Sequence, residues 1–495
     1  MLDGILAGVS AAFTPFNLLM VLGGCFAGTL IGMLPGLGPA TAVALMIPLT
    51  YALDPASAII LMAGVYYGAV FGGSTSSILI NAPGCASTLA TTFDGFPLAR
   101  QGQAGKALAL AALSSFSGGT IGALALLIAA PLLAQLALGF QSPDYFALMI
   151  FALVGVSSLA DKGQVLSAYA MAVLGLMLAT VGTDGISGLP RLNFGRADLI
   201  DGFSFLLLAM ATFAVSEVLV TLLREGDREG GAPAAVKGLN VSRSDAKEVR
   251  LPVVRSSIMG FLVGVLPGAG ATIASFLAYG AERRLAAPEK QKAFGRGSVI
   301  GVAAPEAANN AASTGSFVPM LTLGIPGSGT TAIMLGALIA HGIQPGPRLY
   351  VDEPALFWGV IVSMYLGNLV LLALNLPLIP YLARILMVPR GVLYPLVMLF
   401  SLLGVYLVSF NAVDLLIMVV LSVFAVGFRL AGFPLAPLLL GFIVGGYLED
   451  NLYRSLVLYD GSWSFLWSRP STLVIALMTF ALLLIPMLRG FIRRR

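Results

Sequence analysis

Four Pro-Gly pairs stand inside apolar stretches of this sequence, and their chemistry indicates ligand binding. Proline removes a backbone donor and glycine adds conformational freedom, so an α-helix stops at such a pair. The carbonyls freed there can bind a cation, and the N–H groups that open the next helix can bind an anion. One such pair alone more often marks a kink, but four pairs flanked by Ser, Thr and Asn favour a binding site. The residues expected to line it are Pro35, Gly36, Gly38, Thr41, Pro83, Gly84, Pro267, Gly268, Gly270, Thr272, Pro326 and Gly327.

Neutral hydroxyl and amide side chains surround the second and fourth of these pairs. Such groups suit a carboxylate ligand and a hard cation such as sodium, so a sodium site at the Pro-Gly loops is the one metal site that we expect. The same side chains also pack helices together in membranes, which is the alternative reading for each of them. The members of this set are Ser74, Thr75, Ser76, Asn81, Ser87, Thr88, Asn309, Asn310, Ser313, Thr314, Ser328, Thr330 and Thr331.

Glu306 is the most informative charged residue, because it lies in a weakly charged segment that enters an apolar region. An ionisable group within a membrane is a functional hypothesis by default. It could carry a proton, bind sodium or pair with a basic residue; the alternative is a capping carboxylate at the membrane surface. Asp94 and His341 are weaker candidates, and we expect both to be loop residues.

Several kinds of chemistry find no support in the sequence. His341 is the only histidine, and neither Cys25 nor Cys85 has metal-ligand spacing, so no catalytic residue and no cofactor is predicted. Gly105-Lys106 is followed by Ala107 rather than Ser or Thr, so there is no P-loop for ATP. The net charge of +4 is spread over loops, which gives no footprint for nucleic acid. We therefore predict a protein that is not an enzyme.

The elements that must position these residues are membrane helices. Hydrophobic residues make up 58% of the 495 residues and charged ones only 10%, far below the roughly 25% that is usual for soluble domains. Residues 4–53, 55–93 and 107–143 contain no Asp, Glu, Lys or Arg. Since about 20 apolar residues cross a bilayer, each stretch holds one or two crossings. We predict an all-α polytopic membrane protein with roughly 10–14 segments, several of them broken or re-entrant.

The Pro-Gly pairs recur in the same order in two halves of the chain. Pro35 and Pro267 stand in similar motifs 232 residues apart, and Pro83 and Pro326 in similar motifs 243 residues apart. Between the halves, residues 224–255 hold 12 charged residues among Gly, Ala, Pro and Ser. The predicted organisation is a first membrane repeat over 1–223, a charged soluble linker over 224–255 in the cytoplasm, and a second membrane repeat over 256–495.

Basic residues suggest that the two repeats are inverted in the membrane. Five Lys or Arg residues fall within 283–296, after the third Pro-Gly pair, whereas the equivalent segment 51–57 has none. Basic residues favour cytoplasmic loops, so equivalent loops are expected on opposite sides. Paired broken helices in two such repeats are the best sequence indication of a midplane substrate site in secondary transporters.

The motifs at 34–39, 266–272, 304–312 and 322–331 resemble those of one family, the large membrane subunit of tripartite tricarboxylate transporters (TctA-type permease). The segment Ala304-Pro-Glu-Ala-Ala-Asn-Asn-Ala-Ala312 is the most specific of them. The resemblance covers essentially the whole chain. It implies a multi-pass permease of the bacterial inner (cytoplasmic) membrane that works with a small membrane subunit and a periplasmic solute-binding protein.

From this resemblance we expect the import of citrate-like tricarboxylates or related organic carboxylates, driven by a sodium or proton gradient. The absence of a P-loop supports secondary transport independently. A passive anion channel and an intramembrane enzyme are the alternatives. A channel would more naturally repeat one pore pattern across subunits, and an enzyme would need a nucleophile with a base, or paired Asp residues, at membrane depth.

Overall fold

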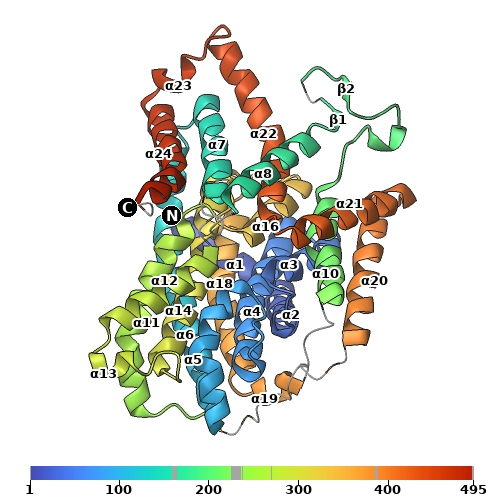
Figure 1. The fold of residues 1–495 in the computed structure, drawn as a ribbon. Coiled ribbons are helices and arrows are strands. Elements are labelled where there is room, and N and C mark those ends of the chain that lie inside the picture. Colours follow the sequence, from blue (N-terminus) through green and yellow to red (C-terminus); the bar gives the residue numbers. More distant parts are fainter. Residues whose placement is uncertain are drawn as a thin grey trace.

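The computed structural model describes residues 2–158, 164–184, 186–224, 236, 238–268, 270–384, 388 and 390–492. Within these ranges the chain is almost entirely helical (Figure 1). The strands found there, β1 (Gly182–Thr183) and β2 (Pro190–Arg191), form a short antiparallel hairpin. The all-α fold class is thereby confirmed.

The first part of the chain runs from α1 to α10. Its elements are α1 (Leu2–Ala12), α2 (Pro15–Met33), α3 (Pro39–Thr50), α4 (Pro55–Ile80), η1 (Ala86–Thr88), α5 (Leu89–Leu98), η2 (Ala99–Gln103), α6 (Ala104–Ala137), α7 (Ser142–Ser158), α8 (Val165–Ala179), η3 (Ala197–Leu199), α9 (Phe205–Ala209), η4 (Met210–Val215) and α10 (Ser216–Arg224). Of these, η2 is a kinked turn at Gly102, and η4 is a π-helical turn that joins α9 to α10.

The second part runs from α11 to α24. Its elements are α11 (Arg243–Val265), α12 (Gly270–Leu285), α13 (Pro288–Gln291), α14 (Val299–Gly315), α15 (Phe317–Leu323), α16 (Gly329–Ala340), α17 (Leu349–Asp352), α18 (Pro354–Asn375), α19 (Ile379–Leu382), α20 (Arg390–Ser409), α21 (Ala412–Leu430), α22 (Ala436–Leu458), α23 (Phe465–Ser468) and α24 (Pro470–Ile492).

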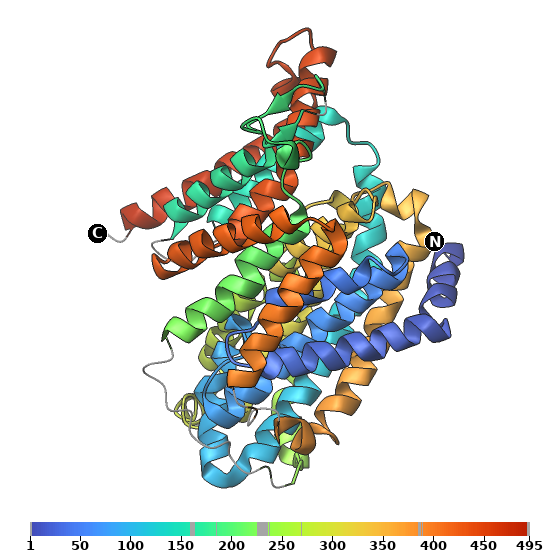
Figure 2. The ribbon, with the colours of Figure 1, turned by 90° about the vertical axis from the view of Figure 1, so that its right-hand side faces the viewer.

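Two groups of helices make up the molecule. Helices α2, α4, α6, α11, α14 and α18 pack together in the larger group, with α4 and α14 almost completely buried. Helices α7, α8, α22 and α24 pack against one another in the smaller group, at the top of Figure 1. Figure 2 shows that α1 lies on the opposite side of the molecule from α24, although the N and C markers lie close together in Figure 1.

Length and composition of the helices fit a membrane protein. In the described ranges, six helical stretches are long and apolar enough to span a bilayer: Pro15–Met33, Pro55–Ile80, Ala86–Ala137, Phe205–Leu223, Pro354–Asn375 and Ala412–Leu430. Seven shorter apolar helices accompany them. Large apolar side chains stay exposed along α20, α21 and α24, as expected of surfaces that face lipid. The polytopic architecture is confirmed, and the total of 10–14 segments stays a prediction.

Each predicted helix break coincides with a Pro-Gly pair. Helices α2 and α3 flank the first pair, α4 and η1 the second, α11 and α12 the third, and α15 and α16 the fourth. Proline opens α3 at its first position, where its missing N–H is not needed. Ser328 and Thr331 form a reciprocal cap that starts α16. The broken helices are therefore present as predicted.

Equivalent glycines make equivalent close contacts in the two halves. Gly32 of α2 packs so tightly on α4 that a Cβ there would overlap the carbonyl oxygen of Ala69. Gly264 of α11 packs in the same way on the carbonyl oxygen of Ala312 in α14. The two glycines are 232 residues apart and the two alanines 243, the same offsets that separate the Pro-Gly motifs. The contact between α2 and α4 is thus repeated between α11 and α14. That the two halves are inverted across the membrane stays a prediction.

The backbone around the second and fourth pairs repeats as well. Asn81 and Gly324 end their helices in the left-handed conformation, with φ of 55° and 69°. Cys85 and Ser328 then open the next helices with nearly the same extended geometry, φ −148° and −153°. Only glycine adopts positive φ at no steric cost, and Asn is among the few other residues that tolerate it.

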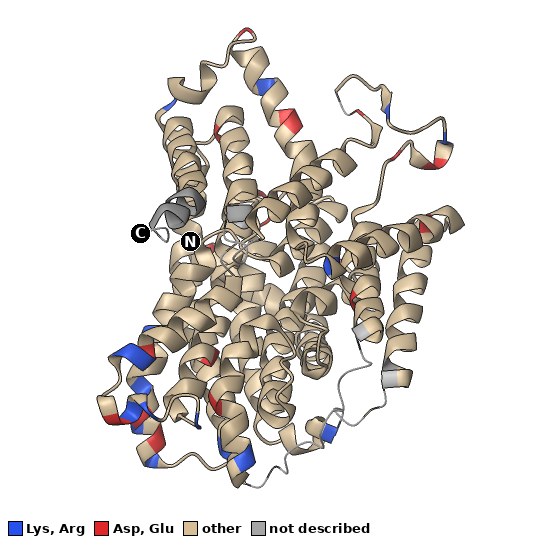
Figure 3. Cartoon of the chain, viewed as in Figure 1, with Lys and Arg blue, Asp and Glu red and all other residues tan. Residues whose placement is uncertain are grey.

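The charged connector falls partly outside the described residues, which exclude 225–235 and 237. From Arg243 onwards the expected linker is helical, because α11 begins there behind a capping box of Ser242 and Asp245. Asp245 pairs with Lys106 at 2.9 Å, which attaches the start of α11 to the start of α6. The boundary expected at residue 255 therefore lies inside α11, and the division into 1–223 and 256–495 stays a prediction. Figure 3 shows that many of the charged residues lie around α11–α13, at one end of the molecule.

Candidate functional site

A cavity of about 570 Å³ lies where the four Pro-Gly breaks meet. Every break contributes at least two wall residues, although the segments are far apart in sequence. Of the residues expected to bind ligand, the wall contains Gly36, Gly38, Thr41, Pro83, Gly84, Ser87, Gly268, Gly270, Thr272, Ser328 and Thr330. The structure therefore brings together the segments that the sequence singles out, and their binding role stays a prediction.

Four helices begin at the wall of this cavity. Their first residues, Pro39 of α3, Gly270 of α12, Gly329 of α16 and Ala436 of α22, all line it. The first-turn N–H groups of a helix have no partner within the helix, and the helix dipole places partial positive charge there. The cavity is consequently suited to an anion.

Tight packing explains why glycine occurs at the breaks. Gly36 and Gly268 have φ of 89° and 80°, a conformation that strains any residue with a side chain. Gly327 has no such φ, but a Cβ there would come within 2.7 Å of the Cα of Ser316. Gly268 also donates its N–H to the carbonyl of Gly327 at 3.1 Å, which joins the third break to the fourth.

The wall includes residues that the sequence analysis missed. Arg429 of α21 and Glu217 of α10 are ion-paired there, and Tyr66, Gln164 and Phe213 are further members of the wall that were not predicted. One signal could have revealed Arg429: it stands near the end of a largely apolar span, 412–430, whose other charged residue is Asp414 at the opposite end, and an ionisable residue in such a span is a functional hypothesis.

Glu306 lies apart from the cavity wall, buried in a cluster of hydroxyl groups. Its Oε2 accepts hydrogen bonds from Ser74 at 2.7 Å and Ser115 at 2.9 Å, and its Oε1 accepts one from Thr91. The side chain is 0% exposed, which rules out the alternative of a capping carboxylate at the surface. Ser74 was expected at the site, whereas Thr91 and Ser115 were not. A small cavity of about 10 Å³ adjoins Ser74 and Ser115.

An amide pair connects this hydroxyl cluster to the cavity. Asn310 donates to the main-chain carbonyl of Glu306 at 3.1 Å and to Oδ1 of Asn309 at 2.7 Å. Asn309 in turn donates to the carbonyl of Ser87 at 3.3 Å, and Ser87 lines the cavity. Three hydrogen bonds therefore link the main-chain carbonyl of Glu306 to the cavity wall.

Other predicted residues lie outside the cavity wall. Several hydroxyls bond locally: Ser76 to Gly73, Ser313 to Asn309, Thr314 to Asn310, and Thr331 to Ser328. The remaining residues, Pro35, Thr75, Asn81, Thr88, Pro267 and Pro326, belong to the breaks or to the ends of the helices beside them.

The expectation that Asp94 is a loop residue is wrong. It lies inside α5 and is 0% exposed. Its Oδ1 accepts the backbone N–H groups of Gly295, Gly297 and Ser298 at 2.7–2.9 Å, and its Oδ2 accepts the hydroxyl of Tyr279. Asp94 therefore fixes the loop that starts α14, the helix of Glu306. His341, in the turn after α16 as expected, contacts Thr50 and stacks on Tyr51.

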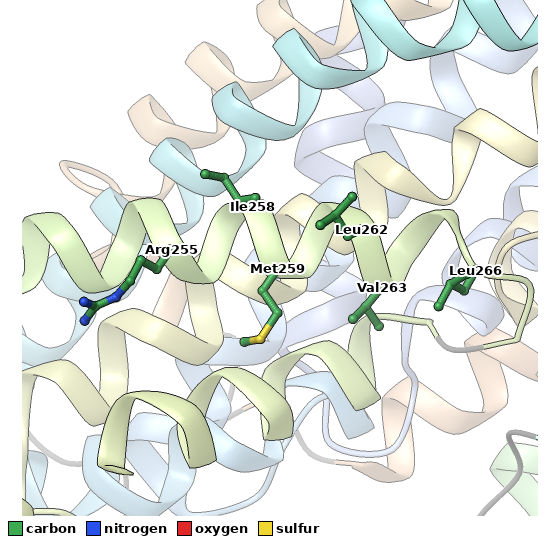
Figure 4. A pocket seen from close by; sticks show the side chains of 6 residues that line it. All are labelled: Arg255, Ile258, Met259, Leu262, Val263 and Leu266. Atoms are coloured by element: carbon green, nitrogen blue, oxygen red, sulfur yellow. The ribbon is translucent and has the colours of Figure 1, made fainter. Parts of the chain in front are cut away.

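A second hollow, of about 390 Å³, lies along α11 (Figure 4). It is lined by Arg255, Ile258, Met259, Leu262, Val263 and Leu266. Five of these six side chains are apolar, so the hollow offers a carboxylate few partners and contacts none of the predicted site residues.

Comparison with known proteins decides the family. The model of the tripartite tricarboxylate transporter TctA family matches residues 18–440. The chain belongs to this family. The matched range of this TctA-family protein contains all four Pro-Gly breaks, Glu306 and Arg429. Membership makes it a membrane subunit of a tripartite transporter rather than an enzyme.

Two relatives from Agrobacterium vitis are similar to this TctA-family chain. One, the "Uncharacterized 52.8 kDa protein in TAR-I ttuC' 3'region", is 42% identical over 495 residues, covering 99% of this chain and 97% of the relative. The other, the "Uncharacterized protein in TAR-II ttuC' 3'region", is 41% identical over 234 residues, covering 47% of this chain and 96% of the relative. No solved structure matches the chain.

Proposed function

We propose that this chain is the ion-gradient-driven permease subunit that imports tricarboxylates, or related organic carboxylates, across the bacterial inner membrane. A periplasmic solute-binding protein delivers the substrate, and a small membrane subunit completes the transporter. The observation that carries the proposal is the cavity at which α3, α12, α16 and α22 all begin.

The cavity has the size and polarity that a small organic anion needs. Its volume of about 570 Å³ falls within the range of small-molecule sites, roughly 300–1,000 Å³. Burying a carboxylate is costly unless charges and donors compensate it. Each helix N-terminus contributes about 0.3–1 kcal/mol toward an anion at exposed sites and up to ~2 kcal/mol in partly buried ones. Four of them, with the hydroxyls of Ser328 and Thr330, support a polycarboxylate as substrate.

Glu306 is the proposed coupling site for a proton or a sodium ion. Its carboxylate and the oxygens of Ser74, Thr91 and Ser115 are hard ligands of the kind that sodium prefers, and a protonated carboxyl would suit the same place. The link through Asn309 to the carbonyl of Ser87 supports an effect of the cation on the substrate cavity.

Alternating access would follow from movement of the two repeats against each other around the breaks. The glycine contact that recurs in α2–α4 and α11–α14 supports two units of similar build, which also pack closely on each other where Gly118 of α6 meets Ala307 of α14. Inverted repeats would then present the cavity to each side of the membrane in turn.

The decisive experiment is uptake of radiolabelled citrate into vesicles that contain this chain, its small subunit and its binding protein. Sodium and proton gradients are imposed separately, and Glu306→Gln is compared with the unmodified chain. We expect the sodium gradient or the proton gradient to drive accumulation of citrate against its concentration gradient. Loss of only the proton-driven component in the variant would identify Glu306 as the proton site.

Two outcomes would contradict the proposal. If neither gradient drives accumulation of citrate or of any carboxylate in a di- and monocarboxylate panel, the chain is not a carboxylate importer. If labelled substrate equilibrates but is never accumulated, and unlabelled substrate on the other side does not accelerate its entry, the chain is a channel.

A further inference from the structure

Arg429 and Glu217 place an ion pair in the wall of the substrate cavity. Among the described residues that line it, Arg429 is the one Lys or Arg and Glu217 the one Asp or Glu. Guanidinium Nη1 contacts Oε2 of Glu217, and both side chains are largely buried, with about a fifth of each exposed. The cavity therefore contains one positive group, already matched by one carboxylate.

The guanidinium is fixed in place by a π-helical turn. Nη2 of Arg429 donates to the carbonyl of Thr212 at 3.0 Å, and the guanidinium carbon lies 5.8 Å from the centre of the Phe213 ring. Both contacts belong to η4, directly before the helix of Glu217. π-Helical turns leave carbonyls available for other donors and occur often at functional sites. Arg429 is thus held with its charge at the cavity wall.

Glu217 also reaches the first Pro-Gly break. An ideal Cβ on Gly36 would lie 3.7 Å from Oε1 of Glu217, so this carboxylate stands beside the break while its other oxygen contacts Arg429. Any shift of the Glu217 side chain changes the surroundings of Gly36, which lies in the turn between α2 and α3.

We propose that Arg429 binds a carboxylate of the substrate and that Glu217 takes its place when the cavity is empty. The inference rests on the proposed function and names the group that recognises the anion. Arginine matches a carboxylate with two parallel N–H donors, and it remains charged when buried. In the empty cavity, Glu217 compensates the positive charge of Arg429. When a substrate carboxylate replaces Glu217 on Arg429, the Glu217 side chain moves and the surroundings of Gly36 change.

This arrangement reconciles binding with release. A lone buried arginine would hold a polycarboxylate anion too firmly for turnover, whereas a competing internal carboxylate lowers the net gain on binding. Carriers need a site that binds well enough to load and weakly enough to unload. The alternative is that the pair only joins α10 to α21, in which case removing both charges together leaves substrate binding intact.

The test compares four variants of the full transporter: Arg429→Gln, Arg429→Lys, Glu217→Gln and the double variant Arg429→Gln/Glu217→Gln. Equilibrium binding of citrate to the purified complex and the KM and kcat of citrate uptake are measured, with succinate and acetate as probes of fewer carboxylates. The control is Arg255→Gln/Glu282→Gln, which neutralises an ion pair between α11 and α12 outside the cavity, in which Glu282 is buried and Arg255 is partly exposed.

The proposal predicts opposite effects of the two single neutralisations. Arg429→Gln raises the KM of citrate at least tenfold, and Arg429→Lys restores part of the affinity. Glu217→Gln lowers the citrate Kd severalfold and also lowers kcat, because release becomes slow. The double variant stays as weak as Arg429→Gln, and acetate is affected less than citrate throughout.

A folded double variant with a citrate KM within twofold of the unmodified value would overturn the proposal, and so would a Glu217→Gln variant that binds citrate more weakly. Thermal unfolding of each purified complex establishes that the variants are folded. The proposed function is judged separately, on the unmodified chain, and it fails if that chain accumulates no carboxylate. If the unmodified chain and all the variants take up citrate equally well, only the role of Arg429 is refuted.

Discussion

Ser74 donates a hydrogen bond to Oε2 of Glu306 at 2.7 Å across 232 residues of sequence. Thr91 and Ser115 donate to the same carboxylate, so a charge carried by the second half of the chain is bound by hydroxyls of the first. The two halves therefore share this buried group. A cation that binds or leaves at Glu306 would change the contact between them, as coupling in a carrier of two repeats requires.

Removing the hydroxyl of Ser74 should weaken ion coupling. Ser74→Ala leaves one carboxylate oxygen with a donor fewer, at a cost of about 1–3 kcal/mol to the charged form. We expect gradient-driven accumulation in vesicles to fall severalfold while exchange of substrate between the two sides continues. Ser76→Ala is the matched control on the same helix, since its hydroxyl bonds only to the carbonyl of Gly73. Equal behaviour of the two variants would refute a role for Ser74.

A methyl group at Gly32 should separate α2 from α4. Gly32→Ala forces a Cβ against the carbonyl oxygen of Ala69, and overpacking of this kind costs roughly 1–3 kcal/mol. Gly264→Ala should do the same between α11 and α14. Gly23→Ala is the control, because a Cβ there meets nothing within 4 Å and alanine favours the helix. Thermal unfolding in detergent should show lower midpoints for the first two variants only; an unchanged midpoint for Gly32→Ala would show that this contact relaxes freely.

The sequence predicted which segments form the site better than it predicted the contacts of the charged residues within it. Pro-Gly pairs reveal broken helices because proline and glycine act locally, so the breaks and the repeat were predictable. The convergence of Gly36, Gly84, Gly268 and Ser328 on one cavity followed from the repeat. Local sequence patterns do not reveal which distant residue contacts a charged side chain.

Arg429 and Asp94 illustrate that limit. Each lies in a largely apolar helix, and only the packing of distant helices gives Arg429 its place beside Glu217 and gives Asp94 its three backbone donors. Thr91 and Ser115 were not predicted as contacts of Glu306 for a similar reason, because a Ser or Thr hydroxyl in a membrane helix usually bonds its own backbone.

Asp94→Asn should loosen the loop that starts α14. The carboxylate accepts three N–H groups on one oxygen, and hydrogen bonds to a charged acceptor contribute about 1.5–3 kcal/mol each, so their weakening lowers stability. We expect a lower unfolding midpoint and faster hydrogen exchange at 295–301. Tyr279→Phe is the companion variant, since it removes only the donor to Oδ2 and should have a smaller effect. Unaltered exchange at 295–301 in Asp94→Asn would contradict this account.

Thr41→Val should disturb the substrate cavity with little effect on the rest of the fold. The Thr41 hydroxyl donates to the carbonyl of Phe213 at 2.8 Å, next to the Thr212 carbonyl that binds Arg429. Valine keeps the shape but leaves that buried carbonyl without this donor, at a cost of about 1–3 kcal/mol. Because α3 and Arg429 are attached to the same π-helical turn, we expect the citrate KM to rise by about 3–10-fold, the change that roughly 1 kcal/mol produces. Thr479→Val, which removes only a bond to Ile475 within α24, serves as the control. If both variants transport citrate with the same KM, the turn at 210–215 does not position the cavity wall.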